Sequence, residues 1–216
     1  MKDIPLFDTE FGIADLMLKE VPYRETAYIR IRAVQEGGFL PLLHECRKFC
    51  RMVGAEHIYA AGHDSLADFP LYTSVLEFRG TAQVNSEKTA NLFPVTEETV
   101  SKWRGIYNER MRNVDNSATL ESRDELRIIS SGGAYFAHDN GELLGIGWLE
   151  DTKLLAMAAV KPGAGERVMN SLMSLTEGSS MTLEVASTNS KAIRLYEKLG
   201  FIPVKEISRW YDVSKI

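Results

Sequence analysis

The sequence is poor in cysteine, with only two in 216 residues, and these two, Cys46 and Cys50, lie four positions apart. Residues at this spacing share one face of a helix, so we interpret the pair as small buried core residues. The four histidines, His44, His57, His63 and His138, add no zinc-binding spacing, and we predict no metal site. Without a disulfide framework, the sequence favours a reducing compartment, and we expect the cytoplasm.

The sequence also lacks a long apolar run and an excess of basic residues. No stretch approaches the roughly 20 apolar residues of a membrane span. An acid and a proline interrupt the segment Met1–Pro5, which argues against a signal peptide. Lys and Arg number 25 and Asp and Glu 30, for a net charge of -5. Nucleic-acid-binding domains usually carry a basic excess, so we expect neither nucleic acid nor membrane as a partner.

The first half of the chain has the pattern of a small mixed α/β unit. The composition, 44% hydrophobic and 25% charged, is that of a soluble globular protein. Alternation predicts a strand at 28–34, and helical spacing predicts a helix at 39–53; further strands are expected at 57–60 and 71–79. The polar segment after them reads as a connection. We therefore expect a half-domain at 1–80, a linker at 81–92 and a main domain at 93–216.

The second half predicts a mixed sheet. Helices are expected at about 96–112 and 120–129. Asn140-Gly141 lies between two apolar runs, a strong signal for an antiparallel hairpin. The apolar run 153–160, a helix after it and the strand 181–186 form a strand-helix-strand unit, which requires a parallel pair. A short helix at about 190–199 and a strand at 204–213 complete the chain.

The strand-helix-strand segments of the two halves align with each other at a constant difference in residue number. Ala33 falls on Ala159, Gly37 on Gly163, Cys46 on Leu172 and Ala60 on Ala186. This pattern indicates a partial internal repeat. Identities are few, so two generic units of equal length remain the alternative.

The glycine-rich turn Val160–Gly165 joins a buried strand to a helix. Glycine lets the backbone approach a ligand, and the free amides of the first helical turn attract anions, so a phosphate is the natural ligand. A turn that needs glycine for conformation alone is the alternative. A dinucleotide-binding turn would place an acid near Glu184, but Val168 replaces its third glycine and too little chain follows for a doubly wound sheet.

The segment Leu183–Phe201 resembles the GCN5-related N-acetyltransferase superfamily. The resemblance rests on residues at fixed spacing around the last helix: Asn189, Ala192, Leu195, Tyr196, Gly200 and Phe201. It covers about residues 93–216 and implies an α/β (α+β) fold with a mixed, mostly antiparallel sheet of the acyl-CoA N-acyltransferase type. The first half then reads as a degenerate partial copy, because His63 and Pro70 stand at the shifted positions of Asn189 and Tyr196.

The resemblance implies a transferase that moves the acetyl group of acetyl-CoA, as cosubstrate, directly to a primary amine. Tyr196 would be the general acid that protonates the departing thiolate, and backbone amides around Met157–Val160 would hold the thioester oxygen. The residues expected to bind the cosubstrate are Ala158, Val160, Lys161, Gly163, Ala164, Gly165, Glu166, Arg167, Asn189, Ala192 and Tyr196.

The chain departs from the family at the glycine turn. The family usually has about five more residues between the proline and the Gly-x-Gly, including an Arg or Gln, whereas here Pro162 is followed directly by Gly163. We expect Lys161 or Arg167 to supply the missing positive charge.

The general base and the acceptor are less determined by the sequence. Glu184 is the candidate base, although it is out of phase with the apolar residues of its strand, and a water chain is the alternative. Neither the identity of the amine nor the oligomeric state follows from the sequence. A non-enzymatic module that binds acyl-CoA or a protein partner is the alternative function.

Overall fold

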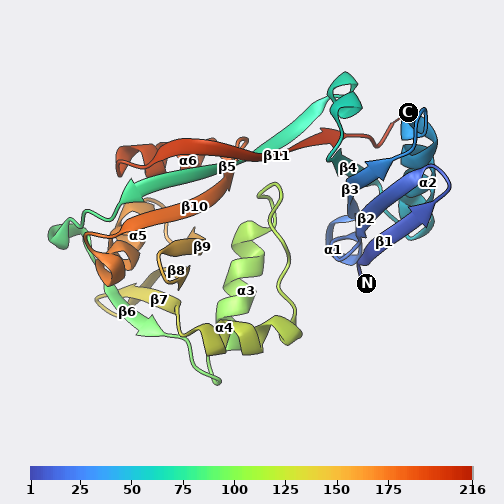
Figure 1. The fold of residues 1–216 in the computed structure, drawn as a ribbon. Helices are drawn as coiled ribbons and strands as arrows, with labels where there is room; N and C mark the ends of the chain where they lie inside the picture. The colour runs from blue at the N-terminus through green and yellow to red at the C-terminus, as the bar shows by residue number, and fades with distance from the viewer. Residues whose placement is uncertain (216) are drawn as a thin grey trace. The chain divides into compact units, whose positions relative to one another are not determined.

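The computed structural model describes residues 1–215, which form two compact units (Figure 1). The first comprises Met1–Ser74 and Ile207–Ile216, and the second comprises Val75–Glu206. In chain order the elements are β1 (Ile4–Thr9), β2 (Gly12–Met17), α1 (Val21–Arg24), β3 (Thr26–Val34), α2 (Phe39–Met52), β4 (His57–Ala61), η1 (Asp64–Asp68), β5 (Leu71–Thr81), η2 (Ser86–Lys88), β6 (Asn91–Pro94), α3 (Val100–Met111), η3 (Ser122–Asp124), α4 (Glu125–Ser131), β7 (Ala134–Asp139), β8 (Glu142–Glu150), β9 (Lys153–Ala159), α5 (Gly165–Met173), η4 (Ser174–Thr176), β10 (Ser180–Ala186), α6 (Ser190–Lys198) and β11 (Ile202–Asp212).

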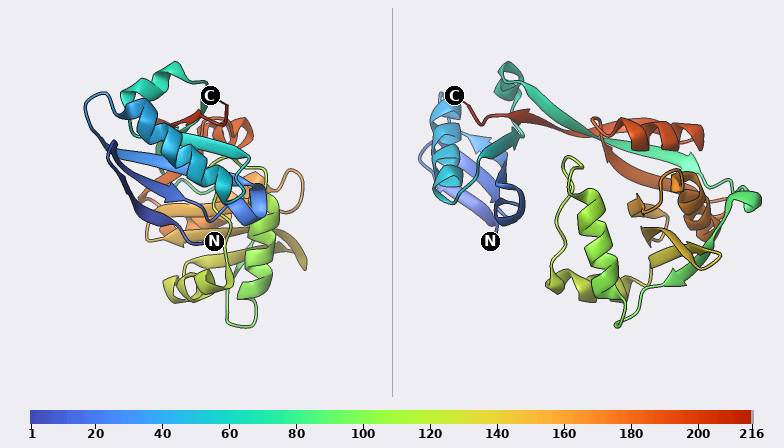
Figure 2. Two further views of the ribbon diagram at one scale, coloured as in Figure 1. Left: turned by 90° about the vertical axis from the view of Figure 1, so that its right-hand side faces the viewer. Right: turned by 180° about the vertical axis from the view of Figure 1, so that it is seen from behind.

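In the first unit, four strands in the order β1-β2-β3-β4 are followed by the end of β11. The helix α2 covers one face of this sheet (Figures 1 and 2). Cys46 and Cys50 lie on its inner face, fully buried and free, as their spacing predicts. Burial raises the pKa of both thiols to about 12, so they remain protonated packing groups.

The second unit contains strands in the order β11-β5-β10-β9-β8-β7-β6, with β9 and β10 parallel and the pairs β6–β7, β7–β8, β8–β9 and β5–β10 antiparallel. The predicted mixed, mostly antiparallel sheet is therefore confirmed. The predicted hairpin turn is present, because Asn140 and Gly141 both have positive φ, at 48° and 81°. One apolar cluster includes residues of α5 and α6, and another includes residues of α3 and α4, so each pair of helices has its own core against the strands.

The last strand of each half of the sequence pairs with the other half. β5 follows the first strand-helix-strand but pairs with β10 over seven positions, from Ser180↔Thr81 to Ala186↔Val75. β11 ends the second half, yet Tyr211 and Asp212 pair with β4. This exchange is why Ile207–Ile216 belongs to the first unit, whereas the sequence pattern assigned it to the second.

The segment predicted to be a linker is bound to α5. The backbone amide of Asn85 donates to Asn170 Oδ1 at 3.1 Å, and that of Ala90 donates to Ser171 Oγ at 2.8 Å. Asn170 and Ser171 are buried, so these bonds satisfy polar groups inside the unit. Much of 81–92 is thus packed onto the second unit.

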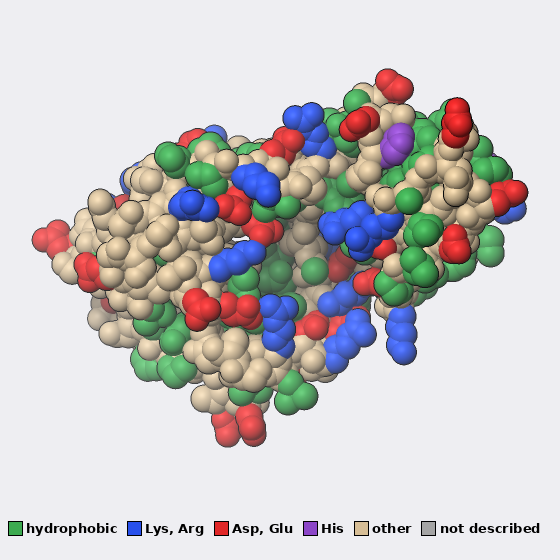
Figure 3. Space-filling model, in the orientation of Figure 1, with side chains coloured by type: hydrophobic (Ala, Val, Ile, Leu, Met, Phe, Trp, Pro, Cys, Tyr) green, Lys and Arg blue, Asp and Glu red, His purple; other side chains and the backbone are tan. Residues whose placement is uncertain are grey.

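Acidic and basic side chains are both present on the face of the molecule drawn in Figure 3. Within residues 1–215, no helix combines the length and the apolar character that crossing a membrane would require.

Candidate functional site

The central feature of the second unit is the divergence of two parallel strands. β9 and β10 pair only at Thr182↔Lys153 and Leu183↔Leu154 within the described residues. Beyond this point β9 continues along β8 to Ala159, and β10 continues along β5 to Ala186. The edge of β9 that faces β10 therefore presents backbone groups without strand partners, which are available to a ligand.

The corresponding strands of the first unit do not diverge. β3 and β4 are also parallel and joined by a helix, but they remain paired over five positions, from Thr26↔His57 to Arg30↔Ala61. The helical turn after β4 is also shorter, a five-residue 3₁₀ helix in place of the nine-residue α6. His63 caps this turn through a hydrogen bond from Ser65 N, as Asn189 caps α6 through one from Ala192 N. The halves thus share connectivity, but among the described residues the parallel pair separates only in the second.

The glycine turn lies at the end of β9 and leads into α5. Gly163 has a φ of 81°, and a Cβ at this position would meet nothing within 4 Å, so the turn is open to solvent. Ala164 caps the helix, and the bond from Val168 N to Ala164 O is its first intrahelical bond. The amides of Gly165, Glu166 and Arg167 precede it and are free of helical acceptors. Free amides at the N-terminus of a helix attract anions.

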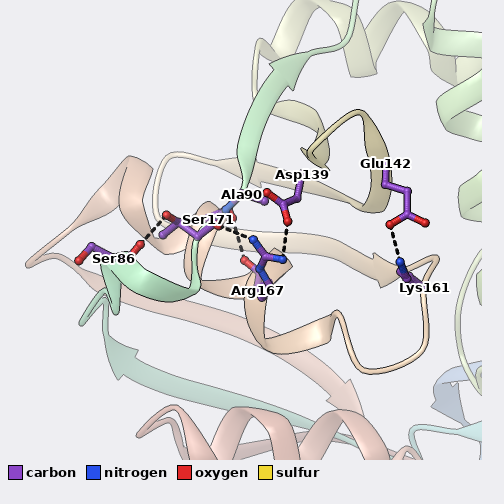
Figure 4. Close-up of polar contacts among 8 residues, drawn as sticks. Ser86, Ala90, Asp139, Glu142, Lys161, Arg167 and Ser171 are labelled. Carbon is purple, nitrogen blue, oxygen red and sulfur yellow. Dashed lines mark hydrogen bonds and ion pairs between the residues drawn. The ribbon is translucent and has the colours of Figure 1, made fainter.

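The two basic residues flanking the turn are each paired with a carboxylate. Lys161 forms an ion pair with Glu142, and Arg167 one with Asp139 at 2.7 Å (Figure 4). Arg167 also donates to the carbonyl of Thr89 at 3.1 Å. We expected Lys161 or Arg167 to supply positive charge for a phosphate, but each is matched by one acid of the β7–β8 hairpin.

Glu166 contacts two basic residues. Its carboxylate accepts from Lys198 Nζ at 2.6 Å and from Lys88 Nζ at 2.8 Å. These hydrogen bonds, from Lys198 first and Lys88 second, lower the pKa of Glu166, so this carboxylate is ionised. The sequence pointed to Lys198 as part of a basic strip on the last helix, but sequence reasoning missed Lys88. The available signal was the pair Asn170 and Ser171, two polar residues among the apolar residues of α5. Polar side chains on the buried face of a helix indicate that another segment forms hydrogen bonds with that face.

Tyr196 lies on the inner face of α6, buried between two rings. Its ring centroid is 6.4 Å from that of Phe78 and 6.3 Å from that of Phe201. Within residues 1–215 the hydroxyl makes no hydrogen bond. Burial raises the pKa of Tyr196 to about 12, so the phenol holds its proton at neutral pH, as a general acid must.

The buried phenol predicts a specific loss of stability at high pH. The unfolded chain ionises tyrosine near pH 10, whereas the folded chain keeps this proton until about pH 12. Between these values the unfolded state binds fewer protons, so the free energy of unfolding should fall as pH rises, by up to about 2–3 kcal/mol for this group. Denaturant titrations from pH 9 to 12 should show a smaller fall for Tyr196→Phe. Equal falls in both proteins would mean that the phenol titrates normally.

Glu184 lies on the opposite face of its strand from the core. It is exposed and forms an ion pair with Lys153 Nζ at 2.5 Å, across from Glu77 of β5. The structure therefore separates it from Tyr196, whose side chain lies within the cluster formed with α5 and α6.

A pocket of about 210 Å³ opens at the start of α6, lined by Asn113, Val114, Asp115, Thr188, Asn189, Ser190 and Lys191. The hydroxyl of Thr188 donates to Asp115 Oδ2 at 2.6 Å. Only Asn189 of this set was expected at a site from the sequence. Thr188, Ser190 and Lys191 flank it in sequence, whereas Asn113, Val114 and Asp115 come from the loop after α3, whose place could not be read from its residues.

Solved structures resemble the chain over almost its whole length. A conserved protein of unknown function from Staphylococcus epidermidis matches with a TM-score of 0.58 and 11% identity, over 95% of this chain and 91% of that one. A GCN5-related N-acetyltransferase from Sphaerobacter thermophilus matches with a TM-score of 0.54 and 9% identity, over 93% and 76%. An acetyltransferase of the same superfamily from Colwellia psychrerythraea matches with a TM-score of 0.52 and 11% identity, over 96% and 84%.

The sequence itself matches no protein-family model and no curated protein. At such low identities the structural likeness establishes the fold and not the activity. The chain therefore has the fold of the GCN5-related N-acetyltransferases, as the resemblance around α6 predicted.

Proposed function

We propose that the protein transfers the acetyl group of acetyl-CoA to a primary amine. The observation that carries the proposal is the divergence of β9 from β10 beside the glycine turn. A narrow ligand with a phosphate at one end fits this arrangement, because its extended part can pair with the open edge of β9 while the phosphate meets the first amides of α5. Val160, which the sequence placed at this edge, instead donates its backbone amide to the carbonyl of Leu144 in β8 at 2.8 Å, so the open edge lies before it, and Gly163–Arg167 form the turn and first helical turn.

The chemistry assigned to the side chains follows from their environments. The thioester supplies an activated acetyl group. Amides of β9 along Met157–Ala159, before the amide of Val160 that donates to Leu144, hold its carbonyl oxygen as negative charge develops there. The amine nitrogen bonds to the carbonyl carbon, the carbon–sulfur bond breaks, and the proton of Tyr196 passes to the sulfur. The nitrogen, left positively charged by the new bond, loses its extra proton to solvent, and solvent returns a proton to the phenol oxygen.

A base must remove the proton of the ammonium, whose pKa is near 10.4 for a lysine-like amine. Glu184 remains our candidate, acting on the opposite face from Tyr196, and a water chain is the alternative. Asn189 and Ala192 support the site by fixing the start of α6: the side chain of Asn189 accepts from the amide of Ala192 at 3.2 Å.

The proposal is tested by the release of free CoA from acetyl-CoA with a panel of amines, and by thermal shift. Acetyl-CoA should raise the melting temperature, because a ligand that binds only the native state stabilises it. Gly165→Val should reduce this shift, since a Cβ there already lies 3.3 Å from Leu195 Cδ2 and a branched side chain would press between α5 and α6. Gly105→Ala in α3, where a Cβ meets nothing within 4 Å, is the control.

Each outcome has a distinct meaning. The absence of any shift at millimolar acetyl-CoA would contradict cosubstrate binding. A shift without CoA release from any amine would favour the non-enzymatic acyl-CoA-binding module.

A further inference from the structure

The ion pairs around the first turn of α5 contain one more cation than anion. Lys161 is balanced by Glu142 and Arg167 by Asp139, one cation to one anion in each pair. Glu166, by contrast, faces two cations, Lys88 and Lys198. This group of three keeps one net positive charge. It lies on the helix end where the backbone dipole is also positive.

The two lysines are brought to this point by different parts of the fold. Lys88 ends η2, in the segment that Asn170 and Ser171 of α5 hold through backbone amides on either side of it. Lys198 is the last residue of α6. Their side chains are 47% and 60% exposed, so both ammonium groups also reach solvent, from which a phosphate would arrive.

We propose that Lys88 and Lys198 bind the phosphates of acyl-CoA, and that Glu166 holds their ammonium groups in place and competes with those phosphates. The proposal rests on the acyl-CoA site of the proposed function. It assigns to Lys88, which lies outside the region that resembles the superfamily, the positive charge that the short glycine turn does not provide. A phosphate offers more charge than one carboxylate, so the lysines can exchange Glu166 for the ligand.

Calorimetric titration with CoA should test the lysines directly. Lys88→Gln and Lys198→Gln should each weaken CoA binding by about three- to tenfold, the size expected for an exposed charged hydrogen bond. Lys153→Gln is the matched control, because Lys153 is also an exposed lysine in an ion pair, with Glu184, but it lies at the other end of β9 from the glycine turn. It should change CoA affinity less than about twofold.

Glu166→Gln separates competition from a merely structural role, because the two predict opposite signs. If Glu166 competes with phosphate, the variant should bind CoA about threefold or more tightly, although its own melting temperature falls for want of a favourable charge in the first helical turn. If Glu166 only stabilises the start of α5, the variant should bind CoA more weakly as its melting temperature falls, or with unchanged affinity.

Repeating the titrations with dephospho-CoA, which lacks the 3′-phosphate, shows which phosphate of CoA the lysines contact. Lysine effects that persist support a contact with the pyrophosphate, and effects that vanish support one with the 3′-phosphate. CoA binding that is indifferent to both lysines, or weaker in Glu166→Gln, would overturn the inference. Lysine effects of the expected size in a protein that releases no CoA with any amine would sink the proposed activity and leave this inference standing.

Discussion

Tyr196→Phe should lower the turnover number of acetyl transfer by about 10²–10⁴-fold, the usual contribution of a general acid. The change removes only the hydroxyl oxygen. The ring keeps its contacts with Phe78 and Phe201, so the fold and the affinity for acetyl-CoA should change little. Because burial raises the pKa of the phenol to about 12, the wild-type group is protonated throughout the neutral range. The measurement is steady-state release of CoA at saturating acetyl-CoA.

A second tyrosine provides the matched control for this variant. Tyr135 lies partly buried against the same apolar cluster, and no role in the site is assigned to it. Tyr135→Phe should therefore leave the turnover number within about twofold of wild type. A Tyr196→Phe protein that turns over like Tyr135→Phe would make Tyr196 a packing residue and end its assignment as the acid.

Removing residues 207–216 should unfold the first unit. This segment contributes Trp210 and Val213, both buried, and its strand pairs with β4 at Tyr211 and Asp212. The carbonyl of Ser214 also accepts from the guanidinium groups of Arg47 and Arg51. Loss of a buried tryptophan alone costs about 3–5 kcal/mol, and a domain of ordinary stability has only about 5–15 kcal/mol in all. Amide exchange across β2–β4 should become fast in the truncated chain.

A rescue experiment distinguishes loss of this strand from general damage. Residues 1–74 alone should not fold stably. The same residues joined by a short glycine-serine linker to 207–216 should regain slow exchange, since β11 neighbours both β4 and β5. Cooperative folding of 1–74 without the added strand would contradict the idea that the exchanged strand completes this unit.

The sequence predicted those elements whose signals are local. The spacing of Leu42, Cys46 and Cys50 predicted α2, because a helix repeats over three to four residues. Asn140-Gly141 predicted its hairpin, because the turn needs positive φ at both residues. β1 and β2 were missed. The pattern of β2, with alternate residues buried from Gly12 to Leu16, is short and became distinctive only beside its partners.

The sequence by itself determined the strand-helix-strand units and the capped start of α6, since each depends on periodicity or on residues within one turn of helix. Only the tertiary structure decided which strands pair: period-two alternation shows which face of a strand is buried but not its neighbour. It therefore decided that β5 and β11 cross to the other half and that β9 and β10 separate where β3 and β4 do not. It also decided which charges meet, because Lys88 and Glu166 are distant in sequence and come together only when the segment before β6 packs along α5.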